Sequence, residues 1–119
     1  MNWYLTKIVF RIICGDGNHT AQFDEQLRLI SAEDKKSAFI KARQIGQCEE
    51  EIFLNVKQEP VHWKFINVSE VYKLGELLDG AELFSRIDEK GDADGYIDII
   101  NDKASGIIHS DSHELLQLV

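Results

Sequence analysis

The residues of this chain that are best spaced to bind a metal lie in the segment 90–98, KGDADGYID. Asp92, Asp94 and Asp98 match the third, fifth and ninth positions of a calcium-binding EF-hand loop. The first position should be a carboxylate but is Lys90, and the twelfth should be a bidentate glutamate but is Asn101. Because both end ligands are missing, we expect no tight calcium site and interpret the segment as a turn that leads into a strand over 96–100.

A second pair of candidate metal ligands is His109 and His113, which are four residues apart. That spacing places two ligands on one face of a helix. The short terminal helix that we expect begins at Asp111, with Glu114 three residues later as its capping partner, so His109 would precede it. The sequence therefore predicts two solvent-facing histidines, no bound metal and no cofactor.

A catalytic set of nucleophile, base and acid is not evident in the sequence. His62 can be combined on paper with Ser69 or Ser85 and a carboxylate into a hydrolytic triad, but neither serine has a nucleophile elbow or a glycine-rich oxyanion segment beside it. Cys14 and Cys48 have no adjacent base that would mark a thiolate. We therefore expect no catalytic residues.

The element that must position any site is the segment 3–14, WYLTKIVFRIIC, which is rich in β-branched and aromatic residues and free of glycine and proline. We expect it to be a central strand. A turn and a return strand over 23–31 follow, with Leu27 and Leu29 on the buried face and Asp24, Gln26 and Arg28 on the wet face.

A helix over 33–46 is predicted next, because Ala38, Ala42 and Ile45 recur at helical spacing and Gly46 can supply a left-handed C-cap. The alternative is that residues 47–51 extend this helix by another turn. Short apolar segments at 51–56 and 61–72 predict two more strands, the second with a bulge near Asn67. A last core strand is expected over 81–87.

These elements predict an α+β domain over residues 1–87. It consists of an antiparallel sheet of four or five strands, in the order β-β-α-β-β with an optional further strand, and one main helix packed on one face. The expected core is Tyr4, Ile8, Phe10, Ile12, Leu27, Leu29, Ala38, Ala42, Ile45, Trp63, Phe65 and Leu83.

The acidity of the chain is concentrated in residues 88–119. The formal net charge is −8, and this segment carries 2 Lys+Arg against 8 Asp+Glu, a net of −6. Such a field repels nucleic acid and attracts basic proteins, although it also serves solubility. We treat the segment as an acidic C-terminal extension with a short terminal helix, whose candidate partner-binding residues are Asp92, Asp94, Asp98 and Asp102.

The cellular setting is expected to be the cytoplasm, with no membrane association. No signal peptide pattern or apolar stretch of transmembrane length is present, and two cysteines are too few for a disulfide framework. The sequence leaves the oligomeric state open, with a homodimer as one option.

Several short motifs in residues 2–87 occur together in one family. They are Trp3-Tyr4-x-x-Lys7-x-x-Phe10, Phe23-Asp24-Glu25, Ile30-x-Ala32, Ala38, Ala42, Ile45-Gly46, Asn55, Val61-x-Trp63-x-Phe65 and Asp79-Gly80-x-Glu82-Leu83. In these motifs the chain resembles the small bacterial proteins of domain of unknown function 4288, which usually have alanine in place of Thr6. The resemblance implies a shared architecture and brings no catalytic or ligand-binding residues with it.

Three classes of function are therefore considered, in order of preference. The first is a non-catalytic protein-interaction module, such as an adaptor or an immunity-type inhibitor of a basic partner. The second is a small-ligand sensor that uses a half-exposed face around Trp3 and Trp63. The third is a metal-dependent hydrolase.

Overall fold

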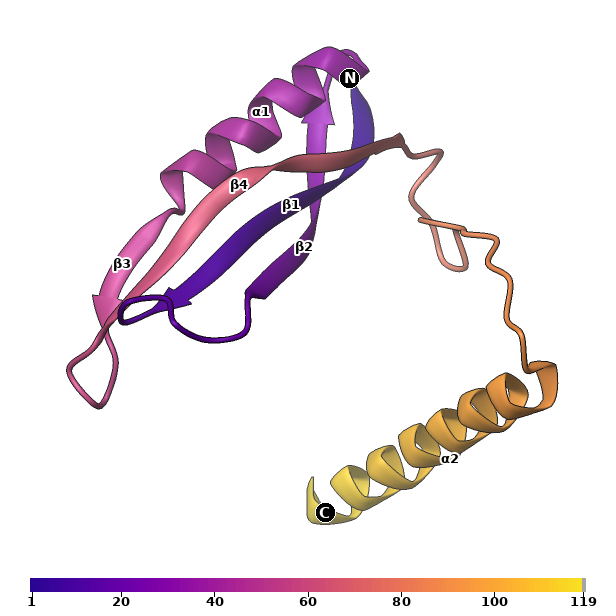
Figure 1. Ribbon diagram of the computed structural model, residues 1–119. Coiled ribbons are helices and arrows are strands. Elements are labelled where there is room, and N and C mark those ends of the chain that lie inside the picture. Colours follow the sequence, from indigo (N-terminus) through magenta and orange to yellow (C-terminus); the bar gives the residue numbers. More distant parts are fainter. Residues whose placement is uncertain (119) are drawn as a thin grey trace. The chain divides into compact units, whose positions relative to one another are not determined.

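The computed structural model describes the backbone of residues 1–118 and the side chains of residues 1–110 (Figure 1). The described chain divides into two compact units, Met1–Ser85 and Arg86–Val119. Neither helix in this part of the chain has the length and apolar character needed to cross a membrane. The elements, in chain order, are β1 (Asn2–Cys14), β2 (Gln22–Ala32), α1 (Lys35–Cys48), β3 (Glu51–Leu54), β4 (Pro60–Lys73) and α2 (Ala93–Leu118).

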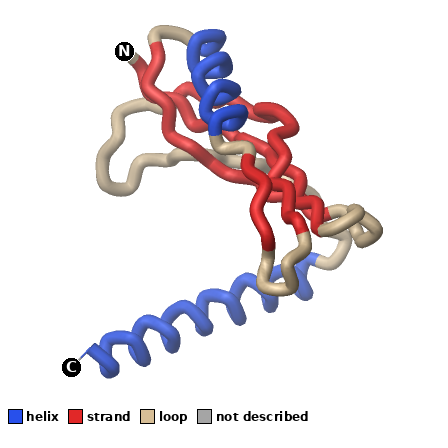
Figure 2. Tube along the Cα trace, turned by 90° about the vertical axis from the view of Figure 1, so that its left-hand side faces the viewer, coloured by secondary structure: helices blue, strands red, loops and turns tan. Residues whose placement is uncertain are grey.

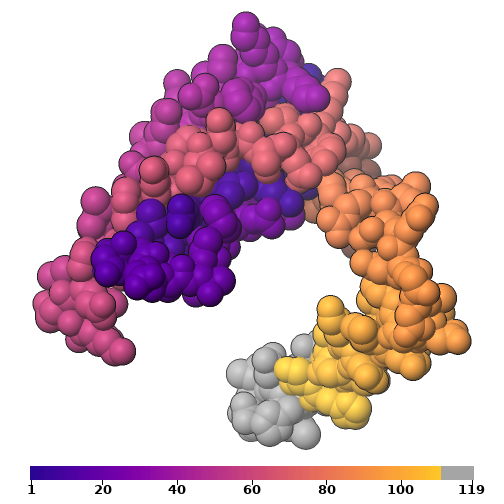
Figure 3. Space-filling model, in the orientation of Figure 1, coloured from indigo at the N-terminus to yellow at the C-terminus, as the bar shows by residue number. Residues whose placement is uncertain are grey.

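The first unit is an antiparallel sheet of four strands in the order β2-β1-β4-β3, so β1 is central as predicted. The register with β4 shifts between Lys7 and Ile8 and again between Val9 and Phe10, on either side of the partner Asn67, which confirms the predicted bulge. Figure 2 shows α1 lying along one face of this sheet, and in Figure 3 its atoms lie directly against those of β4. The unit is therefore an α+β sheet with one covering helix.

The helix α1 sits close to the sheet because its inward positions are small. Ala38, Ala42 and Gly46 are its buried residues. Of the two predicted ends of this helix, the C-cap at Gly46 is wrong, and the helix extends beyond it to Cys48. The next residue caps it, with the N–H of Glu49 donating to the carbonyl of Ile45 at 3.0 Å. Gly46 instead allows the helix to approach the sheet, since a Cβ there would run into the ring of Phe65.

The N-terminus of α1 is capped by Asp34, whose Oδ1 accepts a hydrogen bond from the N–H of Ser37 at 2.7 Å. This bond, followed by one from the Ser37 side chain, lowers the pKa of Asp34 below its ordinary value of 3.8. The stability it contributes is therefore fully present above pH 3.8 and is lost as the pH falls through the lowered pKa. We expect Asp34→Ala to lower the melting temperature at pH 7, and the difference from the unsubstituted protein to shrink below pH 3.8; a gap that stays constant across this range would contradict the capping account.

Most of the predicted core is present on the helix side of the sheet. Buried residues that pack together there are Tyr4, Ile8, Phe10, Ile30, Ala32, Ala38, Ala42 and Val68, with the partly buried Phe39, Ile45, Trp63, Phe65 and Val71 packed against them. Ile12, also predicted for the core, is only partly buried.

The predicted inward face of β2 is wrong. Leu27 and Leu29 are 57% and 50% exposed, whereas Ile30 and Ala32 are buried. The register explains the difference, because Ile30 lies opposite Tyr4 on the helix side of β1 and the odd-numbered residues of β2 therefore point to the other face. That face of the sheet, which α1 does not cover, is called the open face below.

The predicted strand over 81–87 is also wrong, because this segment has no regular structure. Leu83 is half exposed and Ile87 is 97% exposed, so neither contributes to the core. The segment contains one β-branched residue, Ile87, and this favours a strand weakly. Its main fixed contact is an edge-to-face pair between Phe84 and Tyr72, with ring centroids 5.3 Å apart.

The second unit contains the long helix α2, where we expected a turn, a short strand and a separate terminal helix. Its N-terminus lies just after Asp92, whose Oδ1 accepts from the N–H of Gly95 at 3.1 Å. Asp111 is therefore inside the helix and does not begin one. His109 lies in α2 with Nδ1 2.7 Å from the carbonyl oxygen of Ser105, and the side chain of His113 lies outside the described residues.

Candidate functional site

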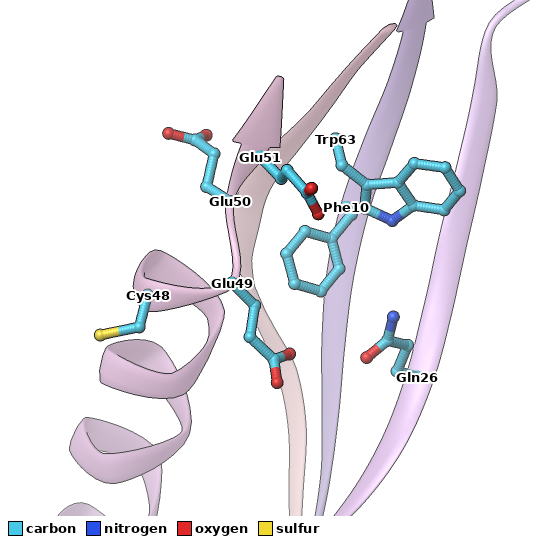
Figure 4. A pocket seen from close by; sticks show the side chains of 7 residues that line it. All are labelled: Phe10, Gln26, Cys48, Glu49, Glu50, Glu51 and Trp63. Atoms are coloured by element: carbon cyan, nitrogen blue, oxygen red, sulfur yellow. The ribbon is translucent and has the colours of Figure 1, made fainter. Parts of the chain in front are cut away.

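The candidate site is a cavity of about 480 Å³ in the first unit, next to the C-terminal end of α1 (Figure 4). This volume is within the range of small-molecule and side-chain binding sites. The cavity is lined by Phe10, Gln26, Cys48, Glu49, Glu50, Glu51 and Trp63.

The floor of the cavity is aromatic. Phe10 is almost fully buried and packs edge-to-face on Phe65, with 6.0 Å between ring centroids. Trp63, two residues before Phe65 in β4, stacks on Phe53 of β3, with ring centroids 6.4 Å apart. Its indole Nε1 donates to Asp24 Oδ2 at 3.3 Å. These contacts hold the Trp63 ring in place, so the aromatic surface is formed before any ligand binds.

One wall of the cavity comes from the polar residues of β2. Asp24 and Gln26, predicted to face water, lie opposite Phe10 and Ile8 and so share the helix side of the sheet. The Gln26 amide donates to Asp24 at 2.6 Å. Arg28 continues this row and binds Glu49 through both terminal nitrogens, with Nη1 3.1 Å from Oε2. Because α1 ends at Cys48, Glu49 is placed at the helix end where Arg28 can reach it.

The opposite wall is acidic and is built by the connection from α1 to β3. In Figure 4 the side chains of Glu49 and Glu51 extend toward the aromatic floor, whereas Cys48 and Glu50 point away from it. Glu50 accepts the N–H of Phe65 at 2.9 Å and lies 3.7 Å from His62 Nε2. Glu51 lies directly opposite Trp63 in the register and has no ion-pair or hydrogen-bond partner among the described side chains.

The arrangement suits a cation. An aromatic face attracts a guanidinium or ammonium group, and a carboxylate at its border adds charge-assisted hydrogen bonds. Three carboxylates border the floor: Asp24, Glu49 and Glu51. The only guanidinium among the described residues here is that of Arg28, and Glu49 already binds it. Within the described residues, no group of three or more His, Cys, Asp or Glu side chains is arranged to hold a metal ion.

Trp3, the other predicted ligand-binding residue, does not line this cavity, and the predicted partner-binding residues belong to the second unit. Trp63 pairs with Ile12 of β1, so both side chains lie on the helix side of the sheet. Side chains alternate between the two faces along a strand, and Trp3 is therefore on the open face. The hypothesis of one ligand face around both tryptophans is therefore wrong. Asp94, Asp98 and Asp102 are four residues apart on one side of α2, and Asp92 caps that helix.

Sequence reasoning selected Trp63 but missed the carboxylates beside it. The available signal was the run Glu49-Glu50-Glu51, which directly follows the helical pattern and precedes a strand. A charged run in such a short connection must lie beside the helix end and the sheet edge. Asp24 and Gln26 could not be found in the same way, because the face they occupy depends on the register of β2.

Comparison with known proteins identifies a family without adding an activity. Residues 3–85 match a family described as Domain of unknown function (DUF4288). No match was found among curated proteins or among solved structures. The match covers more than half of the chain and nearly all of the first unit, so the protein belongs to this family of unknown function.

Proposed function

We propose that this protein is a non-catalytic interaction module that binds a basic protein, one of whose arginine or lysine side chains enters the cavity beside Trp63. The observation that carries the proposal is the combination of a held aromatic floor with carboxylates that have spare acceptor capacity, Glu51 above all. A guanidinium that enters the cavity would gain both cation–π attraction and hydrogen bonds there.

The acidic side of α2 has a supporting part in this proposal. Asp94, Asp98 and Asp102 form an exposed row of like charge along the helix. A row of this kind raises the rate of encounter with a basic partner without fixing its orientation. The cavity would then supply the orientation. Such an adaptor or inhibitor role needs no catalytic group, and its proposed setting is the cytoplasm, where the free thiols of Cys14 and Cys48 stay reduced.

The proposal is tested with a hexa-arginine peptide and the variant Glu51→Gln. The chain has two tryptophans, so Trp3→Phe leaves Trp63 as the only one and makes its fluorescence a report on the cavity. We expect the peptide to change this fluorescence, and Glu51→Gln to weaken binding roughly twofold to fivefold, as for the loss of one exposed charge pair. Binding should also weaken above about 0.15 M salt, where the screening length is about 8 Å.

The matched control is Glu25→Gln, which makes the same charge change on the open face of the same sheet. Both variants remove one negative charge, so the control separates binding in the cavity from general attraction to an acidic protein. Equal weakening by the two variants, or peptide binding that leaves Trp63 fluorescence unchanged, would contradict the proposed site.

A second candidate function, a sensor of a small organic cation, is favoured by the cavity volume alone. Arginine, spermidine and choline are suitable probes in a thermal-shift assay. A free cation that raises the melting temperature at micromolar concentration, and does so less in Glu51→Gln, would favour the sensor over the interaction module.

A further inference from the structure

The outer edge of β2 carries main-chain groups that the sheet does not use. The N–H of Leu74 donates to the carbonyl of Trp3, so the main-chain groups of Trp3 point toward β4. These groups alternate in direction along a strand. The odd-numbered residues of β1 therefore bond to β4, and the even-numbered residues bond to β2. The residues of β2 that pair with even-numbered residues of β1, such as Arg28 with Thr6, direct their main-chain groups to β1. The odd-numbered residues of β2 therefore turn their N–H and C=O groups outward.

Contacts of β2 agree with this assignment. The Thr6 hydroxyl, from β1, donates to the carbonyl of Arg28 at 3.1 Å, and Lys41 Nζ, from outside the sheet, reaches the carbonyl of Ser31 at 3.1 Å. Among the described residues, the outward groups of 23–29 have no such partner. An unpaired strand edge of this length is a template for a further strand.

Apart from Glu25, the side chains of residues 23–29 on this edge are apolar on the open face. Phe23, Leu27 and Leu29 are each at least half exposed. The same three residues carry the outward main-chain groups, so a strand added here would cover both unsatisfied backbone and apolar surface. These features fit a partner strand that is itself apolar on one face.

We propose that the partner is β2 of a second copy, paired antiparallel about a two-fold axis at Gln26. In this register Arg28, whose guanidinium also binds Glu49 of its own subunit, faces Asp24 of the partner subunit. Phe23 faces the partner's Leu29, and Leu27 faces the partner's Glu25. The opposite charges attract and the apolar pair packs. A register with Leu27 on the two-fold axis has no pair between Arg28 and the partner's Asp24. A register with Glu25 on the axis places the two Glu25 carboxylates opposite each other. The charges therefore favour the register with Gln26 on the axis.

This pairing joins the two sheets into one of eight strands and affects the cavity. Gln26 lines the cavity and lies on the axis, so the partner subunit's Gln26 becomes its neighbour and the two cavities open side by side. The dimer does not depend on what the cavity binds. If the cavity takes a basic side chain as proposed, the dimer presents two such sites on one face, a suitable arrangement for a partner with several basic residues.

Sedimentation equilibrium of the full chain tests the oligomeric state. We expect a dimer, and we expect Leu27→Pro, which deletes an outward N–H without touching a bond to β1, to raise its dissociation constant about tenfold or more. Leu27→Thr is the matched control, since it loses the same side chain but keeps the N–H, and it should weaken the dimer less. A monomer at all concentrations, or equal effects of both variants in folded protein, would overturn the proposal.

A cysteine placed on the axis tests the register without relying on Leu27→Pro to fold. In a background of Cys14→Ala and Cys48→Ala, Gln26→Cys should form a disulfide between subunits under mild oxidation, because the paired residues lie within bonding distance across a non-hydrogen-bonded pair. Leu27→Cys in the same background should cross-link more slowly. Faster cross-linking through Leu27→Cys, or none through either, would overturn the register.

Discussion

Replacing Phe10 by alanine is expected to lower the free energy of unfolding by about 3–5 kcal/mol, the cost of emptying a large aromatic position in a core. Phe10 is 1% exposed, packs edge-to-face on Phe65 and lies on the central strand opposite both neighbouring strands. The ring lies on the helix side of the sheet, and the sheet cannot bend into the space that the ring leaves, because β1 is paired with β2 and β4 along its length. The loss is a large part of the stability of a typical small domain.

Urea unfolding of Phe10→Ala, followed by circular dichroism, measures this loss. Phe10→Leu serves as one control, since it keeps most of the volume and should cost less than about 1.5 kcal/mol. Phe84→Ala serves as the other, because Phe84 lies in the same unit but is 43% exposed. A loss below 1 kcal/mol for Phe10→Ala, or equal to that of Phe84→Ala, would show that the core is centred elsewhere.

The second large effect is expected at Gly46, where alanine should destabilise the protein by about 1–3 kcal/mol. Helix propensity alone predicts a gain of about 1 kcal/mol from this change, so the sign distinguishes the two accounts. A Cβ at this position would meet the edge of the Phe65 ring and lie 3.1 Å from Ile8 Cγ2. The ring has little freedom to move, because it packs on Phe10.

The contribution of Phe65 is isolated by the double variant Gly46→Ala with Phe65→Leu. The smaller side chain makes room for the new methyl group, so the double variant should lose less than the sum of the two single losses. Additive losses would show that the clash is elsewhere. A Gly46→Ala protein as stable as the original, or more stable, would show that α1 does not pack as closely as described.

The sequence predicted β1 and α1 well because their patterns allow few alternatives. The segment of β1 is long, apolar and free of breakers, and Ala38 and Ala42 mark a narrow buried stripe on α1. The face of β2 was predicted wrongly because both of its alternating sets contain apolar residues. Ile30 and Ala32 compete there with Leu27 and Leu29, and only the place where α1 crosses the sheet decides between them.

The helix α2 was missed because its isoleucines resemble a strand locally. Residues 96–100, YIDII, favour a strand by propensity, and Gly95 and Gly106 suggest breaks. Over a longer window, small and apolar residues recur at alternating intervals of four and three residues, which is the spacing of one helix face. They are Ala93, Ile97, Ile100, Ala104 and Ile107. This longer pattern determines the structure.

Entry of a basic side chain into the cavity beside Trp63 can be observed by NMR titration of the ¹⁵N-labelled full chain with the hexa-arginine peptide. We expect the largest shifts at the indole N–H of Trp63 and the amides of Glu49, Glu50 and Glu51, with smaller shifts along α2. Shifts confined to Asp94, Asp98 and Asp102, with the Trp63 indole signal unmoved, would show that the peptide does not enter the cavity.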